Sequence, residues 1–494
     1  AALLPGRGAH ALPDGNAITP PMGWNSYNAF LRNYHEDDLY PNVVLMDKLG
    51  LVDVGYKYFN VDGVWWNGDY EAGVVDRNET GHWVEPTDKF PSGVKAFSDH
   101  VHQHGMLLGW YTSARKTACC CAPNFMSPMS QGYERQDFER IQEWNVDYFK
   151  VDNCGRDDGV TRKEIMERWS TLVAGTGIVL ENCRVGCMAQ KDKKGELLPP
   201  EKNWIEPWCD DTAHLFRISK DIGKYHRGGD LDGTRAADWE SIMHNAMASR
   251  NLADRAGPGH WLHLDTLDVG NGLLSGHENR AHFALWCMTS SALIIGTDLR
   301  EVSDETLAII SNKRAIAINQ LYEGDAGRLI SDENGIQVWA KRLPGAQVGV
   351  LILNAFGKST TAYTLDFGKA GGWDQVLQQH LYLQELVAEE QLQCTLTEVW
   401  TGNDEPVQGS LSVTLEPHQG AFFTLQNCNL AVGTYPTCDE LYTSCERIEY
   451  QTKRACRASK ARRRACSWCG ADKGCRDRGT GVCVPLRSRF SHCS

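Results

Sequence analysis

Two charged residues stand two positions apart at the end of an apolar run. The segment VDYFKVDNC, residues 146–154, has the short apolar pattern of a buried strand and carries Lys150 and Asp152. Because side chains alternate across a strand with a period of two, both residues face the same side. A lysine there favours the ionised form that a nucleophilic carboxylate needs, and it can also donate to a hydroxyl group. A structural ion pair at a strand end is an equal alternative from this segment alone.

A second carboxyl group, Asp221, follows Arg217 by four residues in the segment FRISKDI, residues 216–222. An arginine at that spacing can orient the carboxylate or bind a ligand, but such charge pairs are also common on solvated helices. Cleavage of a glycosidic bond uses two carboxyl groups in different roles on opposite sides of the bond. We therefore take Asp152 as the candidate nucleophile and Asp221 as the candidate general acid and base.

Aromatic residues gather at or near the ends of the predicted strands. Sugars present apolar C–H faces that stack on aromatic rings, so several of these residues are candidates for a saccharide pocket. With 16 tryptophans in the chain, we expect about half of this set to be core packing instead. The set is Trp24, Trp65, Trp66, Trp110, Tyr111, Trp208 and Trp261.

The elements that must position these residues follow an alternating pattern. Short apolar runs that end in polar or aromatic residues alternate with longer helical stretches, which predicts a parallel sheet. Eight such strands and no glycine-rich phosphate fingerprint indicate an α/β fold of the (β/α)8 TIM-barrel type, whose active sites lie at the carboxyl ends of the strands. The predicted strands are residues 22–27, 56–62, 106–112, 146–152, 177–181, 203–208, 259–265 and 293–298.

The pattern changes along the 494 residues, a length that favours two or three domains. Residues 1–17 have no periodicity and are predicted to be a leader or strap, followed by the barrel over 18–320. Short alternating strands, such as 337–341, 348–354 and 410–415, predict an antiparallel β-sandwich over 321–427. Residues 428–494 hold nine cysteines and few aliphatic residues, which predicts a small module held by disulfides.

Charge and cysteine content narrow the classes of partner and compartment. The formal net charge of −13 argues against general binding to nucleic acids or anionic membranes, and no apolar run is long enough to span a membrane. Eighteen cysteines without the spacing of a zinc site favour disulfides and a secreted or endomembrane protein, with no metal. Asn78-Glu79-Thr80 is an acceptor for N-glycosylation, and a start at Ala1 suggests a removed signal peptide.

Separated motifs resemble those of glycoside hydrolase family 27, the α-galactosidase and α-N-acetylgalactosaminidase group. They occur in the family's order and cover about residues 18–427. The barrel motifs are TPPMGWNSY (19–27), GYKY (55–58), DYFKVDNC (147–154), AGPG (256–259) and TDLR (297–300), and the sandwich motifs are EVWTG (398–402) and EPHQG (416–420).

The resemblance implies a role for each matching residue. Asp152 is expected to be the nucleophile and Asp221 the acid/base of a double displacement with retention and no cofactor. Trp24, Asp62, Trp65, Tyr111, Lys150, Arg184, Arg217 and Asp265 are the expected substrate-binding residues. A disulfide beside the nucleophile is implied between Cys154 and one of Cys119, Cys120 or Cys121, and Cys183 with Cys209 is expected as a second bridge.

Three departures from the family's pattern fall on sugar recognition. The second strand ends in Asp62-Gly63 where the family usually has two aspartates for the hydroxyls at C4 and C6. Leu262-His263 replaces an Asn-Asp pair, and Cys183-Arg184 stands where the family often has Cys-Glu-Trp. Since each lost partner costs about 1–3 kcal/mol, plain galactosides are expected to be poor substrates. Arg184 and His263 motivate the hypothesis of a modified, differently configured or anionic sugar.

The cysteine-rich tail is similar to the small module of plexins, semaphorins and integrins, through Cys466-Ser467-Trp468-Cys469 and Cys475. Such a module predicts an interaction or spacer role and a protein partner. For the barrel, two alternatives to an α-galactosidase remain open: a non-catalytic carbohydrate-binding or structural protein on the same fold, and an α-glycosidase with another specificity, such as an arabinopyranosidase or an isomaltose-releasing enzyme.

Overall fold

The protein is described here by a computed structural model. It describes residues 12, 14–31, 33–66, 77–116, 129–153, 159–183, 185–189, 198, 205–225, 235–271, 273–367 and 392–430. Arg184, Cys119, Cys120, Cys121 and Cys154 lie outside these residues, as does the predicted module beyond residue 430.

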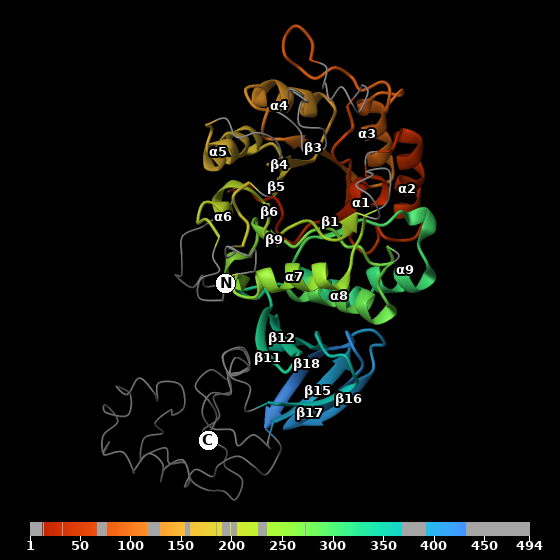
Figure 1. The fold of residues 1–494 in the computed structure, drawn as a ribbon, viewed down its shortest axis with the longest axis vertical. Coiled ribbons are helices and arrows are strands. Elements are labelled where there is room, and N and C mark those ends of the chain that lie inside the picture. The colour runs from red at the N-terminus through yellow and green to blue at the C-terminus, as the bar shows by residue number, and fades with distance from the viewer. Residues whose placement is uncertain are drawn as a thin grey trace, which may run out of the picture.

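Eight parallel strands form the first unit, a TIM-like barrel. They are hydrogen-bonded in the order β10-β1-β2-β3-β4-β5-β6-β9. A parallel bridge between Leu267 and Ile295 brings the segment after β9 against β10, and the strands form a ring in Figure 1. The strands are β1 Met22–Asn25, β2 Tyr58–Asn60, β3 Leu107–Ser113, β4 Tyr148–Asp152, β5 Val179–Cys183, β6 Leu215–Arg217, β9 Trp261–His263 and β10 Leu293–Ile295.

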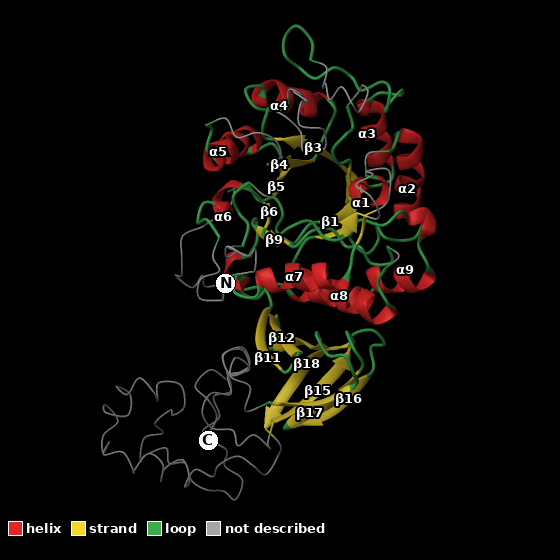
Figure 2. Ribbon diagram, viewed as in Figure 1, coloured by secondary structure: helices red, strands yellow, loops and turns green. Residues whose placement is uncertain are grey.

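Helices cover the outside of this ring, as Figure 2 shows. Several begin with a side-chain cap: Thr161 and Ser275 each form a capping box with a glutamate three residues on, which satisfies the free N–H groups of the first turn. The helices are α1 Ser26–Phe30, α2 Glu36–Lys48, α3 Val94–Gln103, α4 Glu134–Glu143, α5 Arg162–Val173, α6 Cys209–Thr212, α7 Trp239–Ser249, α8 Gly276–Met288, α9 Asp304–Ile310 and α10 Lys313–Gln320, with short 3-10 turns at Ala253–Arg255 and Leu299–Glu301. Two short strands, β7 Lys224–Tyr225 and β8 Arg235–Ala236, pair with each other.

Seven of the eight predicted strands overlap an observed one, but the sixth was predicted in the wrong place. Residues 205–208 are not a strand, and the sixth barrel strand is Leu215–Arg217. That strand is three residues long, too short to show a period of its own, and it pairs with β5 on one side and β9 on the other. The shift matters for the site, because it makes Arg217 the last residue of a barrel strand.

The second unit is an antiparallel sheet in the order β11-β12-β13-β18-β15-β16-β17-β14. Its own core brings Leu365 and Leu415 together with Val350 and Leu425, which is the packing of a β-sandwich. Between β16 and β17 only the pair Gln408–Ser410 continues the sheet. The strands are β11 Arg328–Glu333, β12 Ile336–Leu343, β13 Gln347–Asn354, β14 Thr361–Asp366, β15 Leu392–Glu398, β16 Asp404–Gln408, β17 Ser410–Leu415 and β18 Gly420–Leu430.

The two units share packing, and the N-terminal residues lie against the barrel. Trp339, Leu351 and Phe422 of the second unit belong to the same hydrophobic cluster as the barrel. Asp14 Oδ1 lies 3.1 Å from His214 Nε2, so the described part of the predicted extension is a strap on the barrel. The domain boundaries given above stay predictions. Among the described residues, we find no helix with the length and apolar character needed to cross a bilayer.

Candidate active site

Polar residues from four barrel strands and the loops that follow them meet at the carboxyl ends of the strands. Since all eight strands are parallel, these ends lie on one face of the barrel, where TIM-barrel enzymes place their catalytic groups. We call one set the charged ring, and its members come from the ends of β2, β4, β6 and β9 and the loops after them. The charged ring is Asp62, Lys150, Asp152, Arg217, Asp221 and Asp265.

Asp152, the last residue of β4, is held by two hydrogen bonds. The phenol of Tyr111 on β3 donates to Asp152 Oδ2 at 3.0 Å, and the backbone N–H of Asn153 donates to Oδ1 at 2.7 Å. The residue is only 9% exposed, so few other orientations are open to the carboxylate. Asp152 therefore presents a fixed oxygen pair at the mouth of the barrel.

Lys150 forms its ion pair with Asp62 and not with Asp152. Its Nζ lies 2.8 Å from Asp62 Oδ2, and Asn25 Nδ2 donates to the same oxygen at 2.8 Å. Burial opposes the charge on Lys150, but Asp62 and, more weakly, Asp152 raise the pKa of Lys150 well above its ordinary value. The Lys150–Asp152 ion pair considered from the sequence is therefore not the one that forms, because Lys150 pairs with Asp62 and stands as a positive charge near the nucleophile candidate.

Arg217 links Asp221 to Asp265. Its Nη2 lies 3.1 Å from Asp221 Oδ1, and its Nη1 lies 2.8 Å from Asp265 Oδ1. Burial works against the guanidinium charge, yet Asp265 above all raises the pKa of Arg217 over its ordinary value. The predicted Arg217–Asp221 pair is therefore confirmed, and it is part of a three-membered bridge.

Asp265 adopts an unusual backbone conformation to reach that bridge. Its φ is 96°, in the left-handed region that favours glycine. Trp286 Nε1 donates to the Asp265 carbonyl at 2.8 Å, and the N–H of Ile222 donates to Oδ2 at 2.6 Å. Backbone strain of this kind persists where surrounding contacts enforce it, and it is concentrated at functional sites.

Sequence reasoning missed Glu181 as a functional candidate. Glu181 on β5 is 3% exposed, and Tyr148 donates to its Oε2 at 2.6 Å. His263 Nδ1 lies 3.2 Å from Oε1, whereas the buried Nε2 of His263 has no hydrogen-bond partner among the described residues. Side-chain alternation along β5 is the signal that could have pointed to Glu181. Lys150 and Glu181 are register partners on neighbouring strands, so their side chains share one side of the sheet.

The buried core holds six of the seven strand-end aromatic residues, more than the half expected: Trp24, Trp65, Trp66, Trp110, Tyr111 and Trp261. Trp24 and Trp65 both have 0% exposure, which leaves no surface for a sugar to stack on. Trp24 Nε1 donates to the Thr297 carbonyl, and Trp65 Nε1 donates to the Tyr111 carbonyl, both at 2.9 Å. These buried aromatic residues therefore support the site through packing. The prediction that Trp24 and Trp65 contact the substrate is wrong.

The absence of a side chain at Gly63 leaves room for the Tyr111 ring. A Cβ atom at residue 63 would lie 3.1 Å from Tyr111 Cε1, tighter than most real contacts. The phenol ring thus packs on the bare backbone where the family pattern would put a second aspartate. Val64 follows with φ of 69°, unusual for a β-branched residue. The departure at Gly63 is therefore coupled to the hydrogen bond that Tyr111 makes with Asp152.

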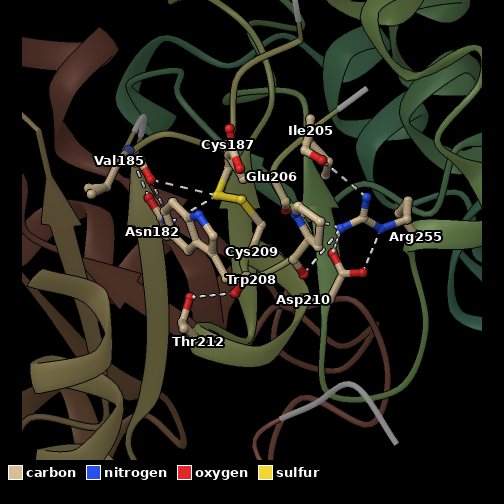
Figure 3. Close-up of a disulfide and its surroundings, with 11 residues drawn as sticks. Asn182, Val185, Cys187, Ile205, Glu206, Trp208, Cys209, Asp210, Thr212 and Arg255 are labelled. Atoms are coloured by element: carbon tan, nitrogen blue, oxygen red, sulfur yellow. Dashed lines mark hydrogen bonds and ion pairs between the residues drawn. A yellow bond between two sulfur atoms is a disulfide. The ribbon is translucent and has the colours of Figure 1, made fainter. Parts of the chain in front are cut away.

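The disulfide predicted between Cys183 and Cys209 is wrong by one cysteine. Cys209 pairs with Cys187, with Cα atoms 5.9 Å apart, as Figure 3 shows. Cys183 is a buried free thiol on β5, 3.8 Å from Arg217 Nη1. Cys187 lies beyond the turn held by Asn182, so it reaches α6, whereas Cys183 points with the strand's inner side chains.

A second disulfide, Cys394–Cys428, joins β15 to β18. It places Cys428, predicted as the first cysteine of the tail module, in the sandwich. The predicted partners of Cys154 lie outside the described residues. Asn78 of the glycosylation motif is exposed in a turn, where its Oδ1 accepts from the N–H groups of Thr80 and His82 at 3.0 Å.

Comparison with known proteins adds to this geometry. Residues 19–321 match the family described as "Alpha galactosidase A", and residues 333–425 match the "Alpha galactosidase C-terminal beta sandwich domain". The chain is 30% identical over 422 residues to an α-galactosidase of Oryza sativa subsp. japonica, covering 84% of this chain and 86% of that protein. It is 31% identical over 415 residues to α-galactosidase 2 of Arabidopsis thaliana, covering 83% and 90%.

Solved structures agree. The crystal structure of a putative α-galactosidase from Bacteroides fragilis is similar with a TM-score of 0.66 and 27% identity, over 84% of this chain and 81% of that one. Both units of the fold thus have counterparts among known proteins.

Proposed function

The chain belongs to the α-galactosidase family, glycoside hydrolase family 27, and on that premise we propose that it hydrolyses terminal α-linked sugars by a retaining double displacement. It is a glycoside hydrolase of the α-galactosidase type; the roles of its residues and its sugar are the subject of the proposal. Asp152 is the nucleophile and Asp221 is the general acid and base.

In the first step, Asp152 attacks the anomeric carbon of the terminal sugar. A bond forms between that carbon and the carboxylate, the glycosidic bond breaks, and Asp221 gives its proton to the departing oxygen. In the second step, Asp221 takes a proton from water, the water oxygen bonds to the anomeric carbon, and the ester to Asp152 breaks. Two inversions at one carbon leave its configuration unchanged.

The observation that carries this proposal is the difference between the two carboxyl environments. Asp152 is 9% exposed and held by two donors, whereas the Asp221 side chain is 33% exposed and rests on Arg217. A buried, oriented carboxylate suits a nucleophile, and an exposed one can exchange protons with water. Different surroundings for two acids at one site are what assigns separate roles to them.

The first experiment compares the wild type with Asp152→Asn and Asp221→Asn on a panel of 4-nitrophenyl glycosides. We expect both variants to lose at least about a thousandfold in kcat. Azide restores turnover of an activated substrate in Asp221→Ala and gives a glycosyl azide of retained configuration. Proton NMR of the first product reports the anomer directly.

Asp147→Asn is the matched control, because Asp147 is adjacent to the other end of β4 and pairs with His102. It should keep wild-type turnover. An inverted first product excludes the retaining mechanism, and a wild type without turnover on every glycoside favours a carbohydrate-binding role.

A second candidate substrate is suggested by the bonding of Asp62. Its Oδ2 accepts from Asn25 and Lys150, and its Oδ1 accepts from the N–H of Gly63 at 2.8 Å. A carboxylate has about four lone-pair sites, so one remains for a sugar hydroxyl. With Gly63 in place of a second acceptor, this end of the site matches a pyranoside with a single hydroxyl there.

The matching test uses two substrates that differ only in the hydroxymethyl group. 4-Nitrophenyl β-L-arabinopyranoside has the ring configuration of the α-D-galactopyranoside and lacks that group. We expect its kcat/KM to equal or exceed that of the galactoside. A galactoside preference of tenfold or more, on the order of 1.4 kcal/mol, contradicts the arabinopyranoside reading and leaves the α-galactosidase reading intact.

We also propose that the protein is secreted and carries a glycan on Asn78. The exposed turn at Asn78 and the two disulfides, Cys187–Cys209 and Cys394–Cys428, support an oxidising route. Expression in a secreting eukaryotic host should give protein in the medium whose mass falls on treatment with an N-glycosidase. Thr80→Ala should abolish that fall and Thr80→Ser should keep it; an unchanged mass in the wild type rejects the modification.

A further inference from the structure

A buried acid–base pair lies next to the charged ring. Glu181 on β5 and His263 on β9 are each 3% exposed, and His263 Nδ1 lies 3.2 Å from Glu181 Oε1. The other oxygen of Glu181 accepts from the Tyr148 phenol at 2.6 Å. Both oxygens of a fully enclosed carboxylate are therefore engaged.

The register places each member beside a cation of the charged ring. Lys150 and Glu181 are partners across β4 and β5, and Arg217 and His263 are partners across β6 and β9. Arg217 in turn pairs with Asp265, whose Oδ1 lies 2.8 Å from its Nη1. Each member of the pair thus lies on the strand next to that of a ring cation.

The charge of Glu181 reaches both cations. Together with Asp62 it raises the pKa of Lys150, and it adds to the effect of Asp265 on Arg217. Burial opposes ionisation of Glu181, but the charges of His263 and Lys150, with hydrogen bonds from His263 and Tyr148, lower the pKa of Glu181 to about 2. These partners therefore favour the ionised form of Glu181 in its enclosed position.

From this geometry we propose that Glu181 and His263 are positioning residues for the reaction, with His263 protonated through its contact with Glu181 so that the charges of the pair cancel next to the charged ring. An unpaired carboxylate at this depth would compete with Asp62 for Lys150 and with Asp265 for Arg217. His263 balances it, so Lys150 and Arg217 remain with their partners in the ring. The inference rests on the proposed function only in naming the reaction that the ring performs.

The surroundings of the pair contain few other groups that titrate in the working range. The ionisable side chains that interact with Glu181 besides His263 are Tyr148, Lys150, Cys183 and Arg217. The ring carboxylates Asp62 and Asp265 are in turn the partners of Lys150 and Arg217. Burial raises the pKa values of Tyr148 and Cys183 well above their ordinary values, so both stay neutral. A change in the pair's net charge is therefore felt mainly by the carboxyl groups of the ring.

The test asks whether a second substitution, Glu181→Gln, reverses the effect of His263→Gln. His263→Gln leaves Glu181 as an uncompensated anion, which favours the protonated form of every carboxyl group nearby. We expect the acid limb of the kcat/KM profile to move to higher pH by about half a unit or more. Adding Glu181→Gln removes the anion, and the limb of the double variant should return to the wild-type position.

A merely structural pair gives a different result, since the double variant would be impaired at least as much as His263→Gln. Tyr148→Phe is the control, because it removes a hydrogen bond to Glu181 and leaves every charge in place. It should keep the wild-type acid limb. A double variant whose limb is no nearer to that of the wild type than the limb of the single variant overturns the proposal.

Thermal stability gives a readout that needs no turnover. The midpoint should fall in His263→Gln and recover in the double variant, because a lone buried charge is costly and a neutral pair is not. The thermal midpoints test the proposed pair even if the wild type hydrolyses no glycoside. A lack of turnover would count against the proposed function alone. An insoluble His263→Gln with a folded double variant supports the pair, and two insoluble variants overturn it.

Discussion

The phenol of Tyr111 on β3 donates to Oδ2 of Asp152 on the neighbouring strand β4 at 3.0 Å. The donor is fixed from two sides: Trp65 Nε1 holds the Tyr111 carbonyl, and the ring packs on Gly63. The loop after β2 thereby controls the nucleophile candidate on β4. This loop contains Val64, with its left-handed backbone, and the buried Trp65 that holds the Tyr111 carbonyl.

Tyr111→Phe should slow the release of the sugar more than its transfer to the enzyme. Breakdown of the ester returns negative charge to Asp152, where the phenol stabilises it. Since a hydrogen bond to a charged group contributes about 1.5–3 kcal/mol, we expect kcat to fall about tenfold to a hundredfold, with a smaller change in kcat/KM. Mass spectrometry of quenched reactions should show the glycosyl-enzyme.

Tyr56→Phe is the control for that variant, because its hydroxyl donates to the Ile310 carbonyl away from the site. It should lower stability and leave kcat unchanged. Equal losses in kcat and kcat/KM for Tyr111→Phe would show that the phenol assists the first step instead.

Arg217→Lys should disable the site although the charge is kept. A single ammonium group cannot replace two guanidinium nitrogens that hold Asp221 and Asp265 at 3.1 and 2.8 Å. We expect kcat/KM to fall by about a hundredfold or more. Arg255→Lys is matched to it, because Arg255 also holds an aspartate, Asp210, with two nitrogens, outside the charged ring. Activity per folded molecule that falls equally in both variants would contradict a specific role for Arg217.

The strand ends that carry chemistry were predictable because a barrel repeats one pattern. Lys150 and Asp152 follow from alternation on β4, and the Arg217–Asp221 contact follows from their spacing. The partners were not predictable, since a sequence does not say which strand faces which across the barrel. Lys150 pairs with Asp62 from β2, and Arg217 reaches Asp265 from β9.

The roles of several buried residues were also not predicted from the sequence. Trp24 and Trp65 are of a residue type that stacks on sugars. Their indole N–H groups instead donate hydrogen bonds to backbone carbonyls inside the barrel. Glu181 was interpreted only as the end of a strand, although a carboxylate in a buried parallel strand is costly unless it is paired. That cost, read from the sequence, is the signal that would have pointed to a partner such as His263.

The disulfide correction yields a test of its own. Cys209→Ser should cost about 2–4 kcal/mol in the free energy of unfolding, because the lost bridge closes a loop with a sequence separation of 22 residues. Cys183→Ser should cost less, because Cys183 is a free thiol. Chemical denaturation measures both variants. Peptide mapping after alkylation in denaturant without reductant should label Cys183 and leave Cys187 and Cys209 unlabelled, and labelling of Cys187 in place of Cys183 would restore the original pairing.

Lys341 of β12 makes stability depend on pH at the junction of the two units. Its Nζ donates to Ser290 Oγ at 2.6 Å and to the carbonyls of Ile318 and Asn319, all from the barrel. Burial lowers the pKa of Lys341 from 10.5 to about 7. Between these values the unfolded chain binds more protons than the folded one, so the free energy of unfolding rises with pH in that window.

Lys341→Met should flatten that rise. We expect the wild type to gain up to about 1.4 kcal/mol per pH unit relative to the variant between pH 7 and 10, and to run parallel to it below pH 7, where the lysine is protonated in both states. Urea denaturation across this range measures the difference, with Lys313→Met, an exposed lysine of α10, as the control that should keep the wild-type slope. Parallel curves for the wild type and Lys341→Met above pH 7 would mean that the three acceptors hold the ammonium charged throughout, and that the junction carries a permanent positive charge.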